Sequence, residues 1–177
     1  MKSNGSGARV FLALWLDSKV QCDLEKLLAR AQIRAAVGCA VSKRNLHITL
    51  QFLGTVESSQ QAAVMSWLPE LEFEPVDLTL DSLGYWPRSG IIWLGPQKMP
   101  RELVEQVRRR RNLLKAFGFF PDRRRFRPHI TLVREARAVK RFDFQPLTWF
   151  SREIVLASSE TLPSAASYSV LVRSGTV

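Results

Sequence analysis

The sequence predicts an α+β protein with largely antiparallel sheets. Short apolar runs typical of strands are mixed with longer helical segments, without the strict alternation of a doubly wound parallel sheet. The 177 residues are enough for one domain with a sizeable core. A Gly-rich phosphate loop and a dinucleotide fingerprint are both absent from the sequence, which removes the common nucleotide-binding parallel folds.

Seven segments have the length and composition of strands. The first (RVFLALWL) is almost entirely apolar, and the second (LHITLQFL) is closed by Gly54. A turn-rich loop, WPRSG at residues 86–90, joins two others. The expected strands are residues 9–16, 46–53, 76–85, 91–94, a part of 126–134, 153–159 and 168–173.

Three helices are expected between these strands, at residues 19–35, 58–69 and 100–117. Asp17 or Ser18 caps the first, whose apolar residues recur at helical spacing. A serine at 58 or 59 opens the second, and Pro100 suits the first turn of the third. We expect residues 1–8 to be a flexible tail and residues 9–177 to form a single domain.

Basic residues are concentrated in the second half of the chain. Residues 1–88 hold nine basic and nine acidic side chains, whereas residues 89–177 hold seventeen and seven, which accounts for the whole net charge of +10. Such a one-sided field favours a polyanionic partner, most often a nucleic acid, although a solvated face is the alternative. On the third helix, residues 108–111 are all arginine, and we expect them to face solvent because the apolar residues occupy another side.

The longest apolar run, residues 10–16, is far shorter than the ~20 residues that span a bilayer. Two cysteines, Cys22 and Cys39, do not make a disulfide framework and indicate a reducing compartment. We therefore expect a cytoplasmic protein that does not associate with a membrane.

The two histidines of the chain, His47 and His129, begin the same tetrapeptide, HITL. In a strand, residues i and i+2 point to one face, so each histidine shares a face with the threonine two positions later. The isoleucine and leucine of each copy face the core. The copies lie 82 residues apart, which suggests two similar lobes that each contribute one strand to a shared cleft.

Two imidazoles that titrate near neutrality suit acid–base displacement at phosphorus, because one takes a proton while the other gives one. Threonine hydroxyls bind non-bridging phosphate oxygens, and a nearby arginine stabilises the developing charge. The histidines and cysteines have no metal-ligand spacing, so neither a metal nor a cofactor is expected. The alternative is a pair of partly buried histidines with only a structural role.

These motifs resemble the two-histidine phosphoesterase superfamily, and within it the RNA 2′,3′-cyclic phosphodiesterases, historically named 2′-5′ RNA ligases. The resemblance implies a bilobal fold in which two antiparallel sheets with outer helices face each other across an active-site cleft. The segments that carry it, besides the two motifs, are residues 9–16 (RVFLALWL), 91–95 (IIWLG), 126–134 (FRPHITLVR), 154–159 and 168–172.

By this resemblance, His47 is the proton donor and His129 the proton acceptor. Thr49, Thr131 and Arg134 correspond to phosphate-binding residues. From the residues alone, the two histidines are interchangeable, and only the resemblance assigns their roles.

Further residues are candidates for RNA contacts. Arg127 faces either phosphate or solvent, while Phe52 and Trp86 either stack a base or belong to the core. A run of arginines before the second motif is a candidate for contacts with the RNA backbone: Arg123, Arg124 and Arg125.

The expected function is metal-independent hydrolysis of RNA 2′,3′-cyclic phosphate ends to 2′-phosphate ends, with reversible 2′-5′ ligation at the same site. The expected partner is an RNA with such an end, and we expect a monomer. The alternatives are a cyclic phosphoesterase that acts on a small nucleotide and an RNA-binding module without catalysis.

Overall fold

A computed structural model describes residues 8–30, 38–120, 125–137, 143–161 and 166–176. Its architecture confirms the predicted α+β class. The strands are β1 (Ala8–Trp15), β2 (Cys39–Ala40), β3 (His47–Val56), β4 (Glu72–Phe73), β5 (Val76–Leu80), β6 (Ser82–Trp86), β7 (Ile91–Gly95), β8 (Ile130–Arg134), β9 (Leu147–Ser151), β10 (Val155–Thr161), β11 (Ala166–Arg173) and β12 (Gly175–Thr176). The helices are α1 (Ser18–Arg30), α2 (Ser58–Trp67) and α3 (Arg101–Leu113), with the 3-10 turns η2 (Lys43–Asn45), η3 (Leu68–Glu70) and η4 (Leu114–Phe117).

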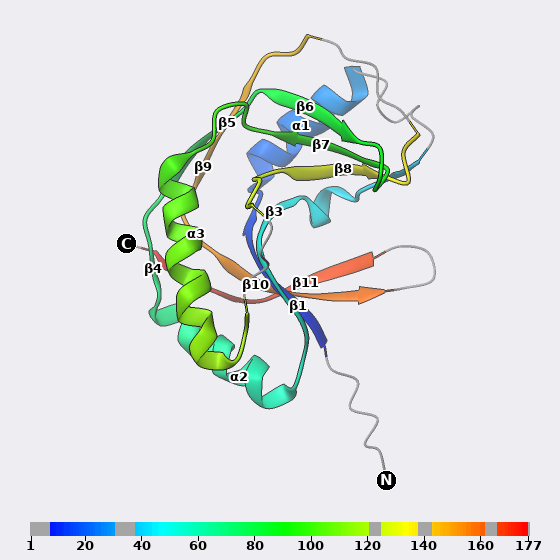
Figure 1. Cartoon of the computed structure of the whole chain (residues 1–177). Helices are drawn as coiled ribbons and strands as arrows, with labels where there is room; N and C mark the ends of the chain where they lie inside the picture. Colours follow the sequence, from blue (N-terminus) through cyan, green and yellow to red (C-terminus); the bar gives the residue numbers. More distant parts are fainter. Residues whose placement is uncertain (1–7, 31–37, 121–124, 138–142, 162–165, 177) are drawn as a thin grey trace.

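The main sheet runs in the order β11-β10-β1-β3-β8-β7-β6, with β2 also paired to β8, and its pairs are antiparallel. Strands β3 and β8 join its two halves through one residue pair, Ile48 and Ile130. In Figure 1, the strands β6, β7 and β8 lie above β1, β10 and β11 and diverge from them. Strand β3 lies between the two sets in the strand order. The two sheets expected from the resemblance are therefore the halves of one sheet that is almost interrupted at this pair.

Alternation along β1 separates two faces of the sheet. Val10, Leu12 and Leu14 are almost completely buried in the main core, together with Leu24 of α1 and Leu103 of α3. Burial of a side chain of this size contributes about 1.5–3 kcal/mol. The helices therefore cover the face to which the even-numbered residues of β1 point.

The odd-numbered residues of β1 face the opposite side. Phe11 and Ala13 form a second, smaller cluster with Val155 and Ala157 of β10, and all four are nearly inaccessible. This cluster is an apolar floor on the face that carries the two histidines.

The element boundaries agree with the sequence signals in several places. Asp17 caps α1, since its carboxylate accepts a hydrogen bond from the Val20 amide at 2.9 Å. The strand expected at residues 76–85 is instead two strands, interrupted at Asp81, whose carboxylate accepts a hydrogen bond from the Gln97 amide. Four strands were not expected: β2, β4, β9 and β12. Three of them, β2, β4 and β12, have only two residues each, and they form by pairing with segments that are distant in the sequence.

The arginines of α3 correct one expectation. Arg110 is only 6% exposed, because it donates hydrogen bonds to the carbonyls of Glu72 and Gln106 and lies over the ring of Phe73. Arg111 donates to the Leu50 carbonyl of β3 at 3.1 Å. Two of the four arginines therefore fasten α3 to neighbouring strands instead of facing solvent, because a guanidinium carries enough donors to satisfy buried carbonyls.

Both cysteines have free thiols and are exposed. None of the helices in the described ranges is long and apolar enough to cross a membrane.

Candidate active site

The two HITL motifs meet where the halves of the main sheet join. Ile48 pairs with Ile130, and both are buried on the core side. The strands are antiparallel, so the residues that flank this pair lie across from each other on the opposite face, His47 near Thr131 and Thr49 near His129. The structure thus brings together the four polar residues that the repeated motif predicts for one face.

Each histidine is oriented by a main-chain carbonyl two residues before it. His47 Nδ1 lies 2.6 Å from the Asn45 carbonyl oxygen, and His129 Nδ1 lies 2.7 Å from that of Arg127. Because a carbonyl only accepts, Nδ1 of each ring carries a proton. In the neutral ring, Nε2 is then the nitrogen that accepts a hydrogen bond or a proton.

Thr49 contacts the histidine of its own motif. Its hydroxyl lies 3.1 Å from Nε2 of His47. With Nδ1 protonated, Nε2 of the neutral ring accepts this hydrogen bond from the hydroxyl. A substrate oxygen that accepts a hydrogen bond from this hydroxyl would therefore compete with Nε2 of His47.

Aromatic rings surround His47. Trp15 is stacked on it at 5.2 Å between ring centroids with an interplanar angle of 6°, and Phe11 lies at 4.9 Å. Tyr168 of β11 meets it edge-on at 5.3 Å. The Trp15 contact arises because Trp15 is paired with His47 and points to the same face of the sheet.

His129 has a different neighbour. The Trp86 ring packs against it at 4.5 Å with an angle of 72°, and Trp86 also contacts Trp93 at 5.3 Å. Phe52, in contrast, is 62% exposed and touches Phe11 at 5.8 Å. Of the two aromatic residues considered for base stacking, Trp86 therefore packs against a histidine and Phe52 presents an open ring to solvent.

The pKa values of both imidazoles are depressed. Burial lowers the pKa of His47 from 6.5 to about 4, assisted by the positive charges of Arg134 and His129, while the Asn45 hydrogen bond opposes the change. Burial also lowers the pKa of His129, again with Arg134, against the Arg127 hydrogen bond. Both rings are therefore neutral near pH 7, and the negative charge of a bound phosphate would raise both pKa values.

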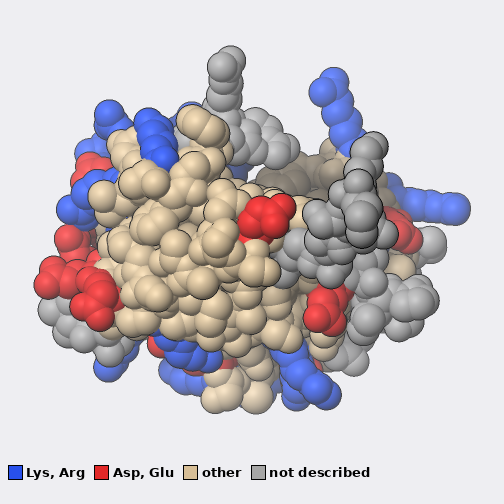
Figure 2. Space-filling model, turned by 90° about the horizontal axis from the view of Figure 1, so that it is seen from below, with Lys and Arg blue, Asp and Glu red and all other residues tan. Residues whose placement is uncertain are grey.

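Arg134 ends β8, is exposed, and donates a hydrogen bond from Nη2 to the Tyr168 hydroxyl at 3.4 Å. The side chains of Arg125 and Arg127 are exposed. Arg123 and Arg124 lie outside the described residues. On the face seen in Figure 2, Lys and Arg lie mainly around the rim, and the centre is largely uncharged.

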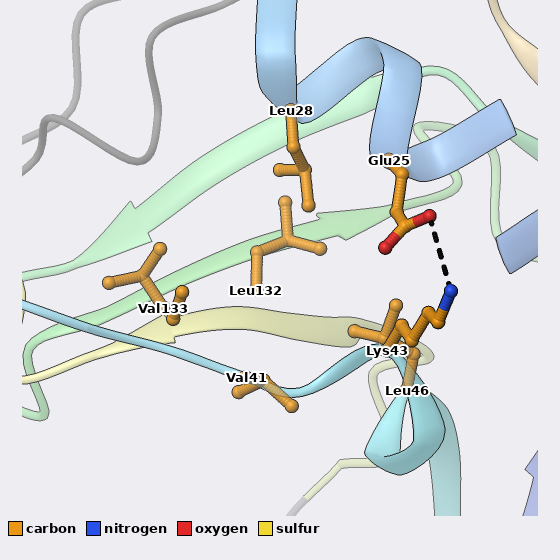
Figure 3. A pocket seen from close by; sticks show the side chains of 8 residues that line it. Glu25, Leu28, Val41, Lys43, Leu46, Leu132 and Val133 are labelled. Atoms are coloured by element: carbon orange, nitrogen blue, oxygen red, sulfur yellow. Dashed lines mark ion pairs between the residues drawn. The ribbon is translucent and has the colours of Figure 1, made fainter. Parts of the chain in front are cut away.

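A cavity of about 50 Å³ lies behind the motifs (Figure 3). Two of its lining residues are next to motif residues of the other face: Leu46 directly precedes His47, and Leu132 follows Thr131 on β8. The cavity is mostly apolar, with an ion pair of 3.7 Å between Glu25 and Lys43 at its edge. Because its lysine is already paired with a carboxylate, this cavity is poorly suited to a phosphate, and the candidate active site is on the opposite face. No three His, Cys, Asp or Glu side chains of the described ranges are grouped so that they could hold a metal ion.

The sequence patterns did not identify Trp15, Phe11 or Tyr168 as neighbours of His47. The odd-numbered apolar residues of the first strand were a signal, since a strand with one buried face needs only alternate apolar positions. Only the pairing of β1 with β3 shows which side chain those residues cover.

Comparison with known proteins agrees with the resemblance. The model of the 2′-5′ RNA ligase superfamily matches residues 20–159. An RNA 2′,3′-cyclic phosphodiesterase of Escherichia coli strain K12 is 34% identical over 128 residues, 72% of each chain. Another, from Archaeoglobus fulgidus, is 31% identical over 132 residues, 73% of each chain.

Solved structures share the fold. The apo form of Escherichia coli LigT has a TM-score of 0.81 at 29% identity, with 97% of this chain and 99% of that chain covered. Its complex with 3′-AMP has a TM-score of 0.80, also at 29% identity, with 94% and 97% covered. The chain therefore belongs to the 2′-5′ RNA ligase superfamily, which confirms the family that its two HITL motifs indicate.

Proposed function

We propose that this protein opens the 2′,3′-cyclic phosphate at an RNA end to leave a 2′-phosphate. The observation that carries the proposal is the matched pair of imidazoles. Each holds its Nδ1 proton against a carbonyl, and each has Nε2 available for proton transfer. The relatives from E. coli and A. fulgidus are named RNA 2′,3′-cyclic phosphodiesterases.

In the proposed reaction, His129 Nε2 takes a proton from water as the water oxygen bonds to phosphorus. The bond from phosphorus to the ribose 3′-oxygen breaks, and this oxygen receives a proton from His47 Nε2. Since free His47 is neutral at pH 7, its proton is acquired as the anionic substrate binds. The assignment of donor and acceptor follows the family.

Three further residues are proposed to bind the phosphate. The hydroxyls of Thr49 and Thr131 donate to its non-bridging oxygens, and the Arg134 guanidinium offsets the developing negative charge. Attack by an RNA 5′-hydroxyl in place of water would give a 2′-5′ bond, so hydrolysis and ligation share this site.

The RNA chain is proposed to extend over exposed side chains near the site. Phe52 is the better-placed ring for stacking a base, because it is largely exposed, whereas Trp86 has its ring against His129. The exposed guanidiniums of Arg125 and Arg127 precede the second motif and are proposed to bind backbone phosphates, together with Arg123 and Arg124. We further propose a cytoplasmic monomer that acts without a metal.

The deciding experiment incubates the protein with an RNA oligonucleotide that ends in a 2′,3′-cyclic phosphate, in EDTA. The expected product is a 2′-phosphate end, identified by mass and by its chromatographic difference from the 3′-phosphate isomer. Loss of activity in EDTA and its return with a divalent ion would contradict the metal-free mechanism.

Two further arms test the alternatives. A nucleoside 2′,3′-cyclic phosphate that is turned over faster than the oligonucleotide would indicate a small-nucleotide enzyme. A protein that binds RNA without opening the cyclic phosphate, and whose affinity is unchanged when both histidines are replaced by glutamine, would be a binding module.

A further inference from the structure

Tyr168 is in contact with both halves of the candidate site. It lies on β11, in the half of the sheet that contains β1 and β3, and is half-buried. Its ring meets His47 edge-on at 5.3 Å and Phe11 at 5.4 Å and 78°. Its hydroxyl accepts a hydrogen bond from Arg134, which lies on β8 in the other half.

This contact restricts a side chain that otherwise has great freedom. Arg134 is exposed and is the last residue of β8, directly before a bend at Glu135, where the backbone φ is +56°. A long arginine at a strand end samples many rotamers in water. The hydrogen bond to the Tyr168 hydroxyl fixes one guanidinium nitrogen beside a tyrosine whose ring contacts His47, and it leaves the other guanidinium donors for an anion.

We propose that Tyr168 is a positioning residue, whose hydroxyl holds the Arg134 guanidinium beside the two histidines and whose ring covers one edge of His47. The proposal rests on the function proposed above for its kinetic consequences. Its effect on the position of Arg134 does not depend on any substrate.

The chain contains two tyrosines, which provides a matched control. Tyr85 also uses its hydroxyl in one hydrogen bond, as a donor to the Ala136 carbonyl at 2.9 Å. Tyr168→Phe and Tyr85→Phe therefore each remove one hydroxyl and one hydrogen bond while the ring is retained. Thermal unfolding of both variants establishes that they are folded and shows the cost in stability.

The kinetic test measures kcat and KM on the cyclic-phosphate oligonucleotide in a double-mutant cycle with Arg134→Gln. We expect Tyr168→Phe to lower kcat/KM by roughly 5- to 20-fold, near the lower limit for a lost hydrogen bond to a charged group, because this bond is 3.4 Å long and exposed. In the Arg134→Gln background the same change should have almost no effect. Tyr85→Phe should leave kcat/KM within about twofold of wild type in either background, since its hydroxyl contacts neither histidine nor Arg134.

The second test needs no substrate. The chain has only two histidines, so each imidazole is followed separately in a proton NMR titration. Arg134 lowers the pKa of both rings, so its release in Tyr168→Phe should raise both, whereas Tyr85→Phe should leave them unchanged.

The outcomes separate the two proposals. If wild type does not open the cyclic phosphate, the proposed function is wrong, and the NMR titration alone decides the role of Tyr168. If wild type is active but Tyr168→Phe retains full kcat/KM, or its effect adds fully to that of Arg134→Gln, the inference about Tyr168 is wrong. Unchanged histidine pKa values in Tyr168→Phe would also overturn it.

Discussion

The two HITL motifs have the same four residues and the same local backbone contact, but different surroundings. In both, Nδ1 of the imidazole donates to the carbonyl two residues before it. His47 is enclosed by three aromatic rings and by the Thr49 hydroxyl, while the ring described against His129 is that of Trp86.

This difference shows that separate levels of structure control the tautomer and the acidity of a histidine. The tautomer follows from the chain within two residues of the ring, so both copies share it. The pKa follows from burial and from distant charges, so it is determined by what β1, β8 and β11 place around each copy. A repeated motif can therefore supply two imidazoles of the same tautomer whose pKa values are each set by their own surroundings.

The largest effect should come from removing either imidazole. His47→Gln and His129→Gln should each reduce kcat on the cyclic-phosphate oligonucleotide by about 10²- to 10⁴-fold, the usual contribution of a general acid or base. The measurement is a single-turnover rate with excess enzyme. Near-complete activity in one variant would show that this copy has no part in proton transfer, and the proposed equivalence of the motifs would fail.

The different surroundings of the two histidines should also affect how the free energy of unfolding depends on pH. The folded-state pKa of His47 is about 4, below its ordinary value of 6.5, so the unfolded chain binds more protons between these values. Stability should therefore fall as the pH is lowered from 6.5 to 4, with a contribution from His47 of about 3 kcal/mol.

Urea unfolding between pH 4 and 7 measures this contribution. His47→Gln should flatten the pH dependence of the free energy of unfolding. His129→Gln should flatten it less, because the described contacts enclose His129 less completely. Equal flattening would show that the two environments are energetically alike.

The threonines offer a smaller contrast. Thr49→Val and Thr131→Val each remove a neutral hydrogen bond to phosphate, which corresponds to about 0.5–1.5 kcal/mol and roughly a 2- to 12-fold loss of kcat/KM. Thr49→Val also removes the hydroxyl bound to Nε2 of His47. We therefore expect its pH–rate profile to shift to higher pH, since unbound Nε2 takes a proton more readily, while Thr131→Val should leave the profile in place. A loss as large as that of the histidine variants would contradict this division of roles.

The smallest effect concerns the arginines before the second motif. Replacing Arg125 and Arg127 together by glutamine should weaken RNA binding at low salt and reduce the slope of log affinity against log salt by about one to two. Arg152→Gln is a control. The Arg152 guanidinium lies over Phe150 of β9, a strand that contains neither motif. An unchanged slope would show that these arginines only face solvent.

Much of the fold and of the candidate site follows from local pattern. Alternation in β1 and the capping carboxylate of Asp17 are properties of a few neighbouring residues, and so is the face shared by His47 and Thr49. Strand β9 was not anticipated, although Trp149 is buried and Phe150 is 45% exposed in the alternation expected of a strand. Arg110 was expected in solvent, because the Glu72 carbonyl that accepts one of its hydrogen bonds belongs to β4, far from α3 in the sequence.

The sequence by itself determined the α+β class, the two repeated motifs and the family, since each depends on residue type and short spacing. Only the tertiary structure decided that Ile48 pairs with Ile130, that Trp15 lies on His47, and that Tyr168 reaches Arg134. The physical reason is that the pairing register joins distant segments, such as Ile48 with Ile130, 82 residues later, and desolvation depends on every group packed around a ring. Neither the pairing register nor the desolvation of a ring can be predicted from the four residues of a motif.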